Sequence, residues 1–246
     1  MKLLTLNTYS WVQTADPETY AALIADILEN EYDAIALQEV NQLSSGTSVN
    51  EPEGYLPTQN EIPIKSDNFA YFLVKSLAEK GLSYHWSWVP CHQGYFRFDE
   101  GVAILSKAPI QSVEQVQLSV VNDFENIHTR RALALETEAA AFVSVHLSWW
   151  KTEEENPFLL EWTSVETAVK KLRGIKPIYV MGDFNNPSRR PQRRLRPDHE
   201  RRLAGCLRRR CNAYWICDCS AGDRRLGRKR SPAAHRLHLL RPAASG

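Results

Sequence analysis

The charge of this 246-residue chain changes sign at Pro187, and this break constrains its fold more than any other feature. Residues 1–187 carry 13 basic and 25 acidic side chains, whereas residues 188–246 carry 17 basic and four acidic ones. The formal charge of +1 is therefore the balance of a segment at −12 and a segment at +13. The first segment is long enough for one large domain with its own core. The second is an Arg-rich tail.

The first segment has the features of a cytoplasmic globular domain. The whole chain is 43% hydrophobic and 10% aromatic, as in folded proteins. Cys91 is the one cysteine before Pro187, which disfavours a disulfide-stapled secreted fold and suits a reducing compartment. The N-terminus reaches the polar Asn7 too early for a signal peptide, and no apolar run has membrane-spanning length. We expect a soluble cytoplasmic protein without a membrane partner.

Strand-like and helix-like segments alternate through residues 1–187. Asp16-Pro17-Glu18 predicts a helix start, and apolar residues follow it at helical spacing as far as Leu28. Residues 41–66 predict a long polar loop. Several strands between flanking helices indicate two packed sheets with helices outside. The other predicted helices are Phe69–Lys80 and Pro157–Leu172, and the predicted strands are Lys2–Leu6, Ala34–Leu37, Tyr84–Val89, Val102–Leu105, Val113–Val121, Ala132–Leu135, Ala141–Leu147 and Pro177–Met181.

Polar residues that suit phosphate chemistry directly follow four of these apolar strands. Catalytic groups concentrate at such strand-to-loop junctions. Glu39 offers the carboxylate oxygen that Mg²⁺ prefers, and the amides of Asn7 and Asn185 orient phosphate or metal-bound water without adding charge. His146 is suited to donate to a developing phosphoryl oxyanion, and Asp183 to orient or deprotonate a water.

Each of these residues also has an ordinary structural interpretation. A glutamate after a strand is usually solvated, a single histidine is usually structural, and Asn-Asn-Pro is a common turn. Their joint occurrence, in order and each after a strand, favours the functional interpretation.

That pattern resembles the endonuclease/exonuclease/phosphatase superfamily, which includes deoxyribonuclease I. The resemblance covers residues 1–187 and implies an α+β, four-layer αββα sandwich, incomplete at the C-terminus. It also implies Mg²⁺-dependent attack of water on phosphorus, with Mn²⁺ as an alternative metal. By motif, Glu39 would be the metal ligand and Asn7 would assist it. His146 would stabilise the transition state, Asp183 and Asn185 would position the nucleophile and phosphoryl oxygens, and Glu100, in Glu-Gly-Val-Ala-Ile-Leu-Ser, would reach toward the site.

Finer motifs are similar to the bacterial maltose 6′-phosphate phosphatase branch of that superfamily. They are Leu-Asn-Thr-Tyr-Ser-Trp, His-Thr-Arg-Arg, His-Leu-Ser-Trp-Trp and Gly-Asp-Phe-Asn-Asn-Pro. The implied partner is a small phosphorylated sugar. Trp149 and Trp150 would form an apolar platform for a sugar face, with core packing as the alternative. Arg130, Arg131 or Arg97 would hold phosphate, with a structural salt bridge as the alternative.

The tail, residues 188–246, has a composition unlike a folded domain. It contains no Phe or Val, so it buries little apolar surface and is expected to be poorly ordered. Its positive charge would suit electrostatic binding of nucleic acid. The spacing of its four cysteines, from Cys206 to Cys219, does not match a standard zinc site.

A shifted reading frame explains the composition of the tail better than nucleic-acid binding or a zinc site does. Suitable codons for Pro232–Leu240, displaced by one base, read Pro-Leu-Arg-Ile-Asp-Tyr-Ile-Phe-Phe, which is similar to a C-terminal strand of the family. Arg194–Leu203 regroups in the same phase to Gly-Tyr-Asp-Gln-Ile-Met-Asn-Gly-Gly. The family's last motif, Ser-Asp-His, occurs nowhere in the chain. We therefore expect the polypeptide to be nearly inactive.

Two other functions compete with a sugar-phosphate phosphatase. The first is a nuclease or phosphodiesterase of the same superfamily, which the negative charge of residues 1–187 disfavours. The second is a non-enzymatic protein that binds nucleic acid through its basic tail.

Overall fold

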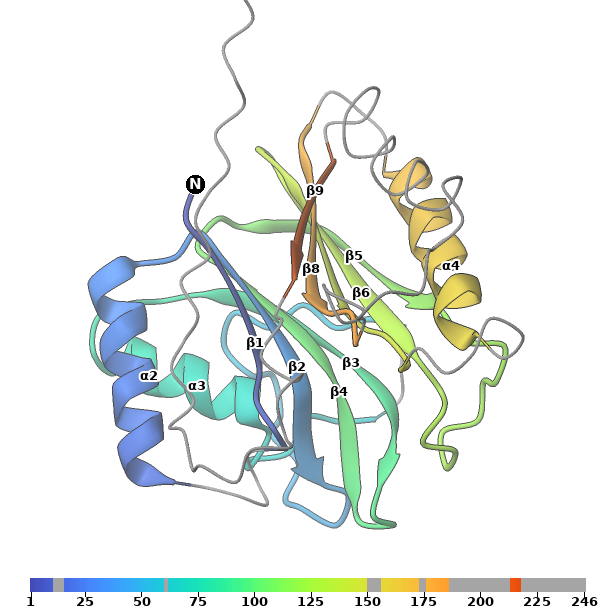
Figure 1. Cartoon of the computed structure of the whole chain (residues 1–246). Coiled ribbons are helices and arrows are strands. Elements are labelled where there is room, and N and C mark those ends of the chain that lie inside the picture. The colour runs from blue at the N-terminus through green and yellow to red at the C-terminus, as the bar shows by residue number, and fades with distance from the viewer. Residues whose placement is uncertain (11–15, 60–61, 150–155, 173–175, 186–212, 218–246) are drawn as a thin grey trace, which may run out of the picture.

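The computed structural model of the chain describes residues 1–10, 16–59, 62–149, 156–172, 176–185 and 213–217 (Figure 1). No helix in these ranges is long and apolar enough to cross a membrane. The helices are α2 (Pro17–Asn30), α3 (Phe69–Ala78) and α4 (Pro157–Lys171), and the strands are β1 (Leu3–Asn7), β2 (Ala34–Leu43), β3 (His85–Gly94), β4 (Phe98–Ser106), β5 (Ile110–Gln117), β6 (Arg131–Thr137), β7 (Ala141–His146), β8 (Ile178–Asp183) and β9 (Ala213–Cys217).

The strands form two sheets. The first has the order β1-β2-β4-β3, in which β1 and β2 are parallel and β4 is antiparallel to both β2 and β3. The second has the order β5-β6-β7-β8-β9, antiparallel as far as β7 and parallel from β7 to β9. Parallel pairing brings the carboxyl ends of β1 and β2 to one edge of the first sheet, and those of β7, β8 and β9 to one edge of the second.

Three apolar cores separate four layers of secondary structure. One core lies between the first sheet and helices α2 and α3, and includes Ile27, Leu73 and Trp86. A second lies between the two sheets, with Ile104 and Leu133 fully buried. The third lies between the second sheet and α4. Figure 1 shows α2 and α3 outside one sheet and α4 outside the other. The expected α+β sandwich of four layers is therefore confirmed.

Local sequence explains where the helices begin. The Asp16 side chain accepts a hydrogen bond from the Glu18 backbone N–H at 3.2 Å, and Pro17 occupies the first turn of α2, as the sequence predicts. Asn68 caps α3 by accepting from the backbone N–H groups of Ala70 and Tyr71. Pro157 begins α4.

Strand lengths depart from the prediction. The predicted loop at residues 41–66 begins later, because β2 continues to Leu43 alongside β4. Strands β3 and β4 extend to Gly94 and Phe98 and form one long hairpin. Polar residues such as His92 and Asp99 occupy these extensions, so an apolar pattern ends too early to reveal them.

The described part of the tail consists of one strand. Within residues 188–246, Ala213–Cys217 forms β9 and pairs in parallel with β8. The remaining tail residues, including Cys206, Cys211 and Cys219, lie outside the described ranges, and the expectation of poor order there stays a prediction.

Candidate active site

Three of the predicted site residues are the last residues of their strands. Asn7 ends β1, His146 ends β7 and Asp183 ends β8. His146 and Asp183 are paired in register across β7 and β8, and the Leu147 N–H donates to the Asp183 carbonyl at 2.9 Å. The strand-end prediction is correct for these three positions, and the pairing fixes their relative height at the edge of the second sheet.

Glu39 lies within β2 instead of after it, which corrects the sequence interpretation. The β2–β4 register shifts between Leu37 and Val40, so a bulge inserts Glu39 into the strand. Its φ of +53° is a left-handed conformation that costs a glutamate roughly 1–2 kcal/mol. Strained backbone of this kind concentrates at functional sites. The bulge turns the Glu39 side chain toward the end of β1.

The amide of Asn7 joins the two sheets at this edge. Its Nδ2 donates to Glu39 Oε1 at 2.9 Å and to Asp183 Oδ2 at 3.1 Å. Its Oδ1 accepts from the Tyr9 N–H at 2.9 Å, which fixes the orientation of the amide. Asp183 is 3% exposed, and its other oxygen accepts from the Asn185 N–H at 2.9 Å. Residues far apart in sequence therefore share one partly buried polar cluster.

Glu100 extends the cluster along β4. Ser10 Oγ lies 2.9 Å from Glu100 Oε2 and 3.4 Å from Glu39 Oε2. His92 Nε2 lies 3.4 Å from Glu100 Oε1, and its Nδ1 lies 3.3 Å from the Thr129 carbonyl. Burial alone would raise the pKa of Glu100, but His92, Ser10 and His146 outweigh it and hold that pKa below its ordinary value. Sequence reasoning missed both His92 and Ser10.

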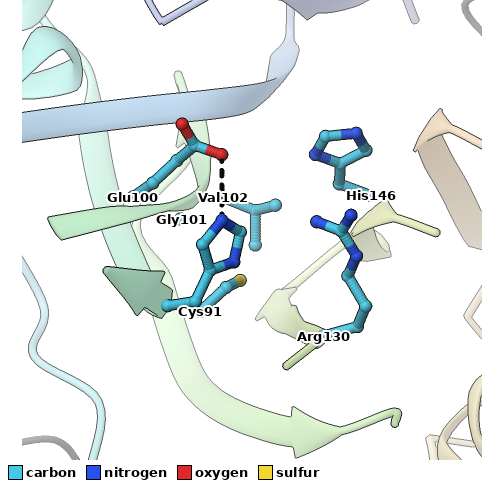
Figure 2. Close-up of a pocket in the computed structure, with 7 residues that line it drawn as sticks. Cys91, Glu100, Gly101, Val102, Arg130 and His146 are labelled. Carbon is cyan, nitrogen blue, oxygen red and sulfur yellow. Dashed lines mark ion pairs between the residues drawn. The ribbon is translucent and has the colours of Figure 1, made fainter. Parts of the chain in front are cut away.

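Arg130 and His146 lie beside each other on one side of a narrow cleft, with Glu100 and Cys91 on the opposite side (Figure 2). Burial and the positive charge of Arg130 lower the pKa of His146 to about 3, although Glu100 opposes the shift. The imidazole is therefore neutral at physiological pH. A neutral imidazole carries one N–H donor, which it can direct at a neighbouring oxygen. The other residues lining the cleft are Cys91, His92, Glu100, Gly101 and Val102.

Arg131 and Arg97 are held by protein groups. Arg131 donates to the Pro90 carbonyl at 2.8 Å, to Gln117 Oε1 at 3.3 Å and to Asn122 Oδ1 at 3.0 Å. Arg97 lies in the β3–β4 turn, with its guanidinium carbon 4.8 Å from the centre of the Phe98 ring. Arg130 is thus the predicted arginine that the structure brings to the His146 cleft.

The remaining predicted residues lie beside His146 and Asp183. Asn185 has φ +46° and donates through Nδ2 to the Leu147 carbonyl at 2.8 Å. Its buried Oδ1 has no hydrogen-bond partner within the described residues. Trp149 is 51% exposed, so the core-packing alternative is excluded for it, whereas Trp150 lies outside the described residues.

Electrostatics at Glu39 suit a bound cation. Burial raises its pKa, the nearby Glu100 and Asp183 carboxylates add to the shift, and hydrogen bonds from Asn7 and Ser10 oppose it. Among the described residues, no three His, Cys, Asp or Glu side chains are grouped as a ready-made metal cage. Mg²⁺ does not require one, since it usually keeps several waters and binds one or two carboxylates. Glu39 is the described residue whose carboxylate would supply such a hard oxygen donor.

Comparison with protein families identifies the class of protein that combines this fold and site. The model of the endonuclease/exonuclease/phosphatase family matches residues 5–236. The chain therefore belongs to the endonuclease/exonuclease/phosphatase family. Members of this family are metal-dependent hydrolases. A search of curated proteins finds no significant match.

Among solved structures, one protein of this family shares the fold, and two others show weaker similarity. A family protein from Leptotrichia buccalis is 25% identical, with a TM-score of 0.64, and the match covers 76% of this chain and 69% of that one. A conserved protein of unknown function from Enterococcus faecalis is 19% identical, with a TM-score of 0.47 and 78% and 69% covered. A 3′-5′ exonuclease from Neisseria meningitidis is 18% identical, with a TM-score of 0.45 and 75% and 58% covered.

Proposed function

We propose that this site hydrolyses the phosphomonoester of a phosphorylated sugar with the help of Mg²⁺. The observation that carries the proposal is that acidic side chains and a basic side chain lie close together at the ends of the strands. Glu39 and Asp183 share the Asn7 amide, while Arg130 stands beside His146 in the adjoining cleft. Carboxylates suit a cation and a guanidinium suits a phosphate, so the arrangement favours a metal-assisted reaction at phosphorus.

Glu39 would hold the Mg²⁺ with Asn7 beside it. When bound, a divalent cation neutralises phosphoryl charge and lowers the pKa of a bound water. The raised pKa of Glu39 supports this assignment, because a carboxylate crowded by Glu100 and Asp183 gains most from a nearby positive charge. The unpartnered oxygen of Asn185 is a second neutral donor at the same edge.

The other residues have distinct proposed tasks. Asp183, which accepts from Asn7 and Asn185 in a buried setting, orients or deprotonates the attacking water. Neutral His146 donates a hydrogen bond to the oxygen on which negative charge develops. Arg130 binds a non-bridging phosphate oxygen, since its charge is already directed at the His146 cleft.

A sugar phosphate is favoured over nucleic acid by charge and by exposed aromatic surface. Residues 1–187 carry a net charge of −12, which opposes a polyanion and tolerates a small monoester. Trp149 is half exposed three residues after His146, where an indole face would contact a sugar ring.

The missing Ser-Asp-His motif bears on activity. Because that motif completes the family's site and is absent here, we infer that the 246-residue chain retains the binding half of the machinery and has little turnover. A one-base correction between the codons of Pro187 and Leu203 would restore the motif's phase, if a shifted frame is the cause. Sequencing the coding DNA across those codons tests this directly.

The experiment compares substrates in the frame-corrected and the 246-residue chains. Release of inorganic phosphate from a phosphorylated disaccharide is measured beside nicking of plasmid DNA, each with Mg²⁺ and with EDTA. We expect the corrected chain to release phosphate only with Mg²⁺, and the 246-residue chain to be nearly inert. Plasmid cleavage without phosphate release would instead favour a nuclease. Robust turnover by the 246-residue chain would refute its predicted inactivity.

A further inference from the structure

One carboxylate faces the apolar core on helix α4. Glu161 is 1% exposed and lies on the same helix face as the buried Phe158, Val165 and Ala168. Removing a carboxylate from water costs several kcal/mol, and an apolar residue of similar size is often equally stable or more stable there. Stability alone therefore does not explain a glutamate at this position, whereas a specific contact would.

Glu161 uses both carboxylate oxygens on a single residue beside the candidate site. Its Oε2 accepts from the Ser148 backbone N–H at 2.7 Å, and its Oε1 accepts from Ser148 Oγ at 2.6 Å. Ser148 is 8% exposed and comes two residues after His146. The pair thus fixes the backbone and the hydroxyl of the segment that follows the end of β7.

The Ser148 hydroxyl connects Glu161 to Arg130. Arg130 Nε donates to Ser148 Oγ over a long 3.5 Å contact. A hydroxyl has one proton and two lone pairs, so its proton points to Glu161 and a lone pair is left for Arg130. This polarity requires an acceptor-only group at position 161, since an amide there can donate to Oγ and compete with the guanidinium.

Electrostatics link the same three residues. Burial raises the pKa of Glu161, while the Ser148 hydrogen bonds and the charge on Arg130 oppose that shift. Arg130 in turn contributes to the lowered pKa of His146. The charge of Glu161 is therefore coupled to the cation that faces the candidate catalytic histidine.

Other contacts already hold the segment from the opposite side. The Leu147 N–H donates to the Asp183 carbonyl, and Asn185 Nδ2 donates to the Leu147 carbonyl. These bonds fix the backbone after His146 but leave the Arg130 side chain unconstrained. Within this group of contacts, the Glu161–Ser148 pair is the one that acts on Arg130.

We propose that Glu161 is a positioning residue that, through the Ser148 hydroxyl, holds the Arg130 guanidinium toward the His146 cleft so that it receives an anionic phosphoryl group. That the bound group is a phosphoryl anion rests on the proposed function. The positioning of Arg130 rests only on the contacts given above.

The test compares three full-length chains: the wild type, Glu161→Gln, and Glu166→Gln as a matched control on the same helix. Glu166 accepts a hydrogen bond from Trp162 Nε1 at 3.2 Å and, within the described ranges, bonds to no residue of the site. Three quantities are measured: the affinity for inorganic phosphate with Mg²⁺, the solvent exchange of the Arg130 Nε–H by NMR, and the melting temperature. The Nε–H signal is assigned from its loss in Arg130→Lys.

We expect Glu161→Gln to weaken phosphate binding about tenfold, as is common for residues that orient a ligand-binding group. Exchange of the Arg130 Nε–H should accelerate, while the melting temperature changes little. Glu166→Gln should resemble the wild type in all three. Ser148→Ala provides a second route, because it removes the hydroxyl link and leaves Glu161 in place, so it should also accelerate the exchange.

Unchanged Nε–H exchange in Glu161→Gln, or in Ser148→Ala if the first variant does not fold, would overturn the positioning role. Faster exchange in a protein whose wild type does not bind phosphate would support positioning and refute the proposed function. The two claims therefore fail separately.

Discussion

Asn7 donates hydrogen bonds to Glu39 at 2.9 Å and to Asp183 at 3.1 Å, so one side chain ties the first sheet to the second at the candidate active site. The two carboxylates come from β2 and β8, which belong to different sheets. Without a shared donor or cation, such carboxylates would repel each other. The Asn7 amide therefore links the two sheets. It also supplies the partial positive charge that keeps the two carboxylates from repelling each other.

Replacing Asn7 by Ala removes that donor and leaves both carboxylate oxygens without it. Leaving buried polar groups unsatisfied costs about 1–3 kcal/mol, so the free energy of unfolding should fall by about 2 kcal/mol. Added Mg²⁺ should recover part of the loss by taking the place of the amide. Urea unfolding measures both values, with exposed Asn50→Ala as the control. A variant as stable as the wild type would contradict the bridging role.

His146 should remain neutral far below the usual range of histidine. Its pKa is lowered from 6.5 to about 3, so between these values the unfolded chain binds a proton that the folded chain does not. The contribution of neutral His146 to the free energy of unfolding is fully present above pH 6.5. It is lost as the pH falls from 6.5 toward 3. From pH 6.5 to 5 the loss is about 2 kcal/mol. His146→Gln should flatten this part of the stability curve. An NMR midpoint for His146 between pH 6 and 7 would contradict the assignment.

Gly182 allows β7 and β8 to approach directly beside Asp183. A Cβ at this position would lie 2.0 Å from the Val145 carbonyl oxygen, and φ is +147°. Gly182→Ala should therefore cost about 4 kcal/mol or more, or prevent folding. Gly81→Ala is a matched control, since its φ is +86° but nothing lies within 4 Å of the added Cβ. We expect it to lose only about 1–2 kcal/mol. Equal decreases in the free energy of unfolding of Gly182→Ala and Gly81→Ala, measured in urea, would show that the close approach of β7 and β8 is not what requires glycine at position 182.

Arg130 and Arg131 should separate in function although they are adjacent. Arg131 donates to three protein acceptors, so Arg131→Lys should lower stability by about 1–2 kcal/mol and leave phosphate affinity unchanged. Arg130 faces the His146 cleft, so Arg130→Lys should weaken phosphate binding about tenfold with little loss of stability. Calorimetry with inorganic phosphate and thermal unfolding distinguish the two. Weaker phosphate binding in Arg131→Lys, with unchanged binding in Arg130→Lys, would refute the choice of Arg130 as the phosphate ligand.

The layers of the fold could be predicted because apolar runs and helix caps are local signals. Asp16-Pro17-Glu18 and Asn68 each begin a helix through contacts within three residues. Asn7, His146 and Asp183 end buried strands, and a polar residue at the end of an apolar run is recognisable in the sequence. The position of Glu39 inside β2 was not predictable, because a bulge depends on pairing with β4 and leaves no mark in the β2 sequence alone.

Residues whose role depends on a neighbouring strand could not be assigned to the site from the sequence. His92 lies in a strand extension and becomes relevant only through Glu100 on β4. Arg130 and Arg131 cannot be told apart from the sequence, because only the folded chain shows that Arg130, just before β6, lines the cleft while Arg131, the first residue of β6, bonds to protein acceptors. Glu161 did leave a signal, namely a charge at an apolar position of a helical pattern. Such a charge is ambiguous until its partner Ser148 is known.

Glu39 is the proposed metal ligand, and a Mg²⁺ titration of the 246-residue chain tests this role without requiring turnover. Calorimetry compares the wild type with Glu39→Gln, and with Glu29→Gln on the exposed face of α2 as control. Because the pKa of Glu39 is raised, Mg²⁺ affinity should increase as the pH rises through that pKa.

We expect Glu39→Gln to weaken Mg²⁺ binding at neutral pH by at least about tenfold, and Glu29→Gln to bind Mg²⁺ as the wild type does. Equal Mg²⁺ affinity in the wild type and Glu39→Gln would contradict this role of Glu39.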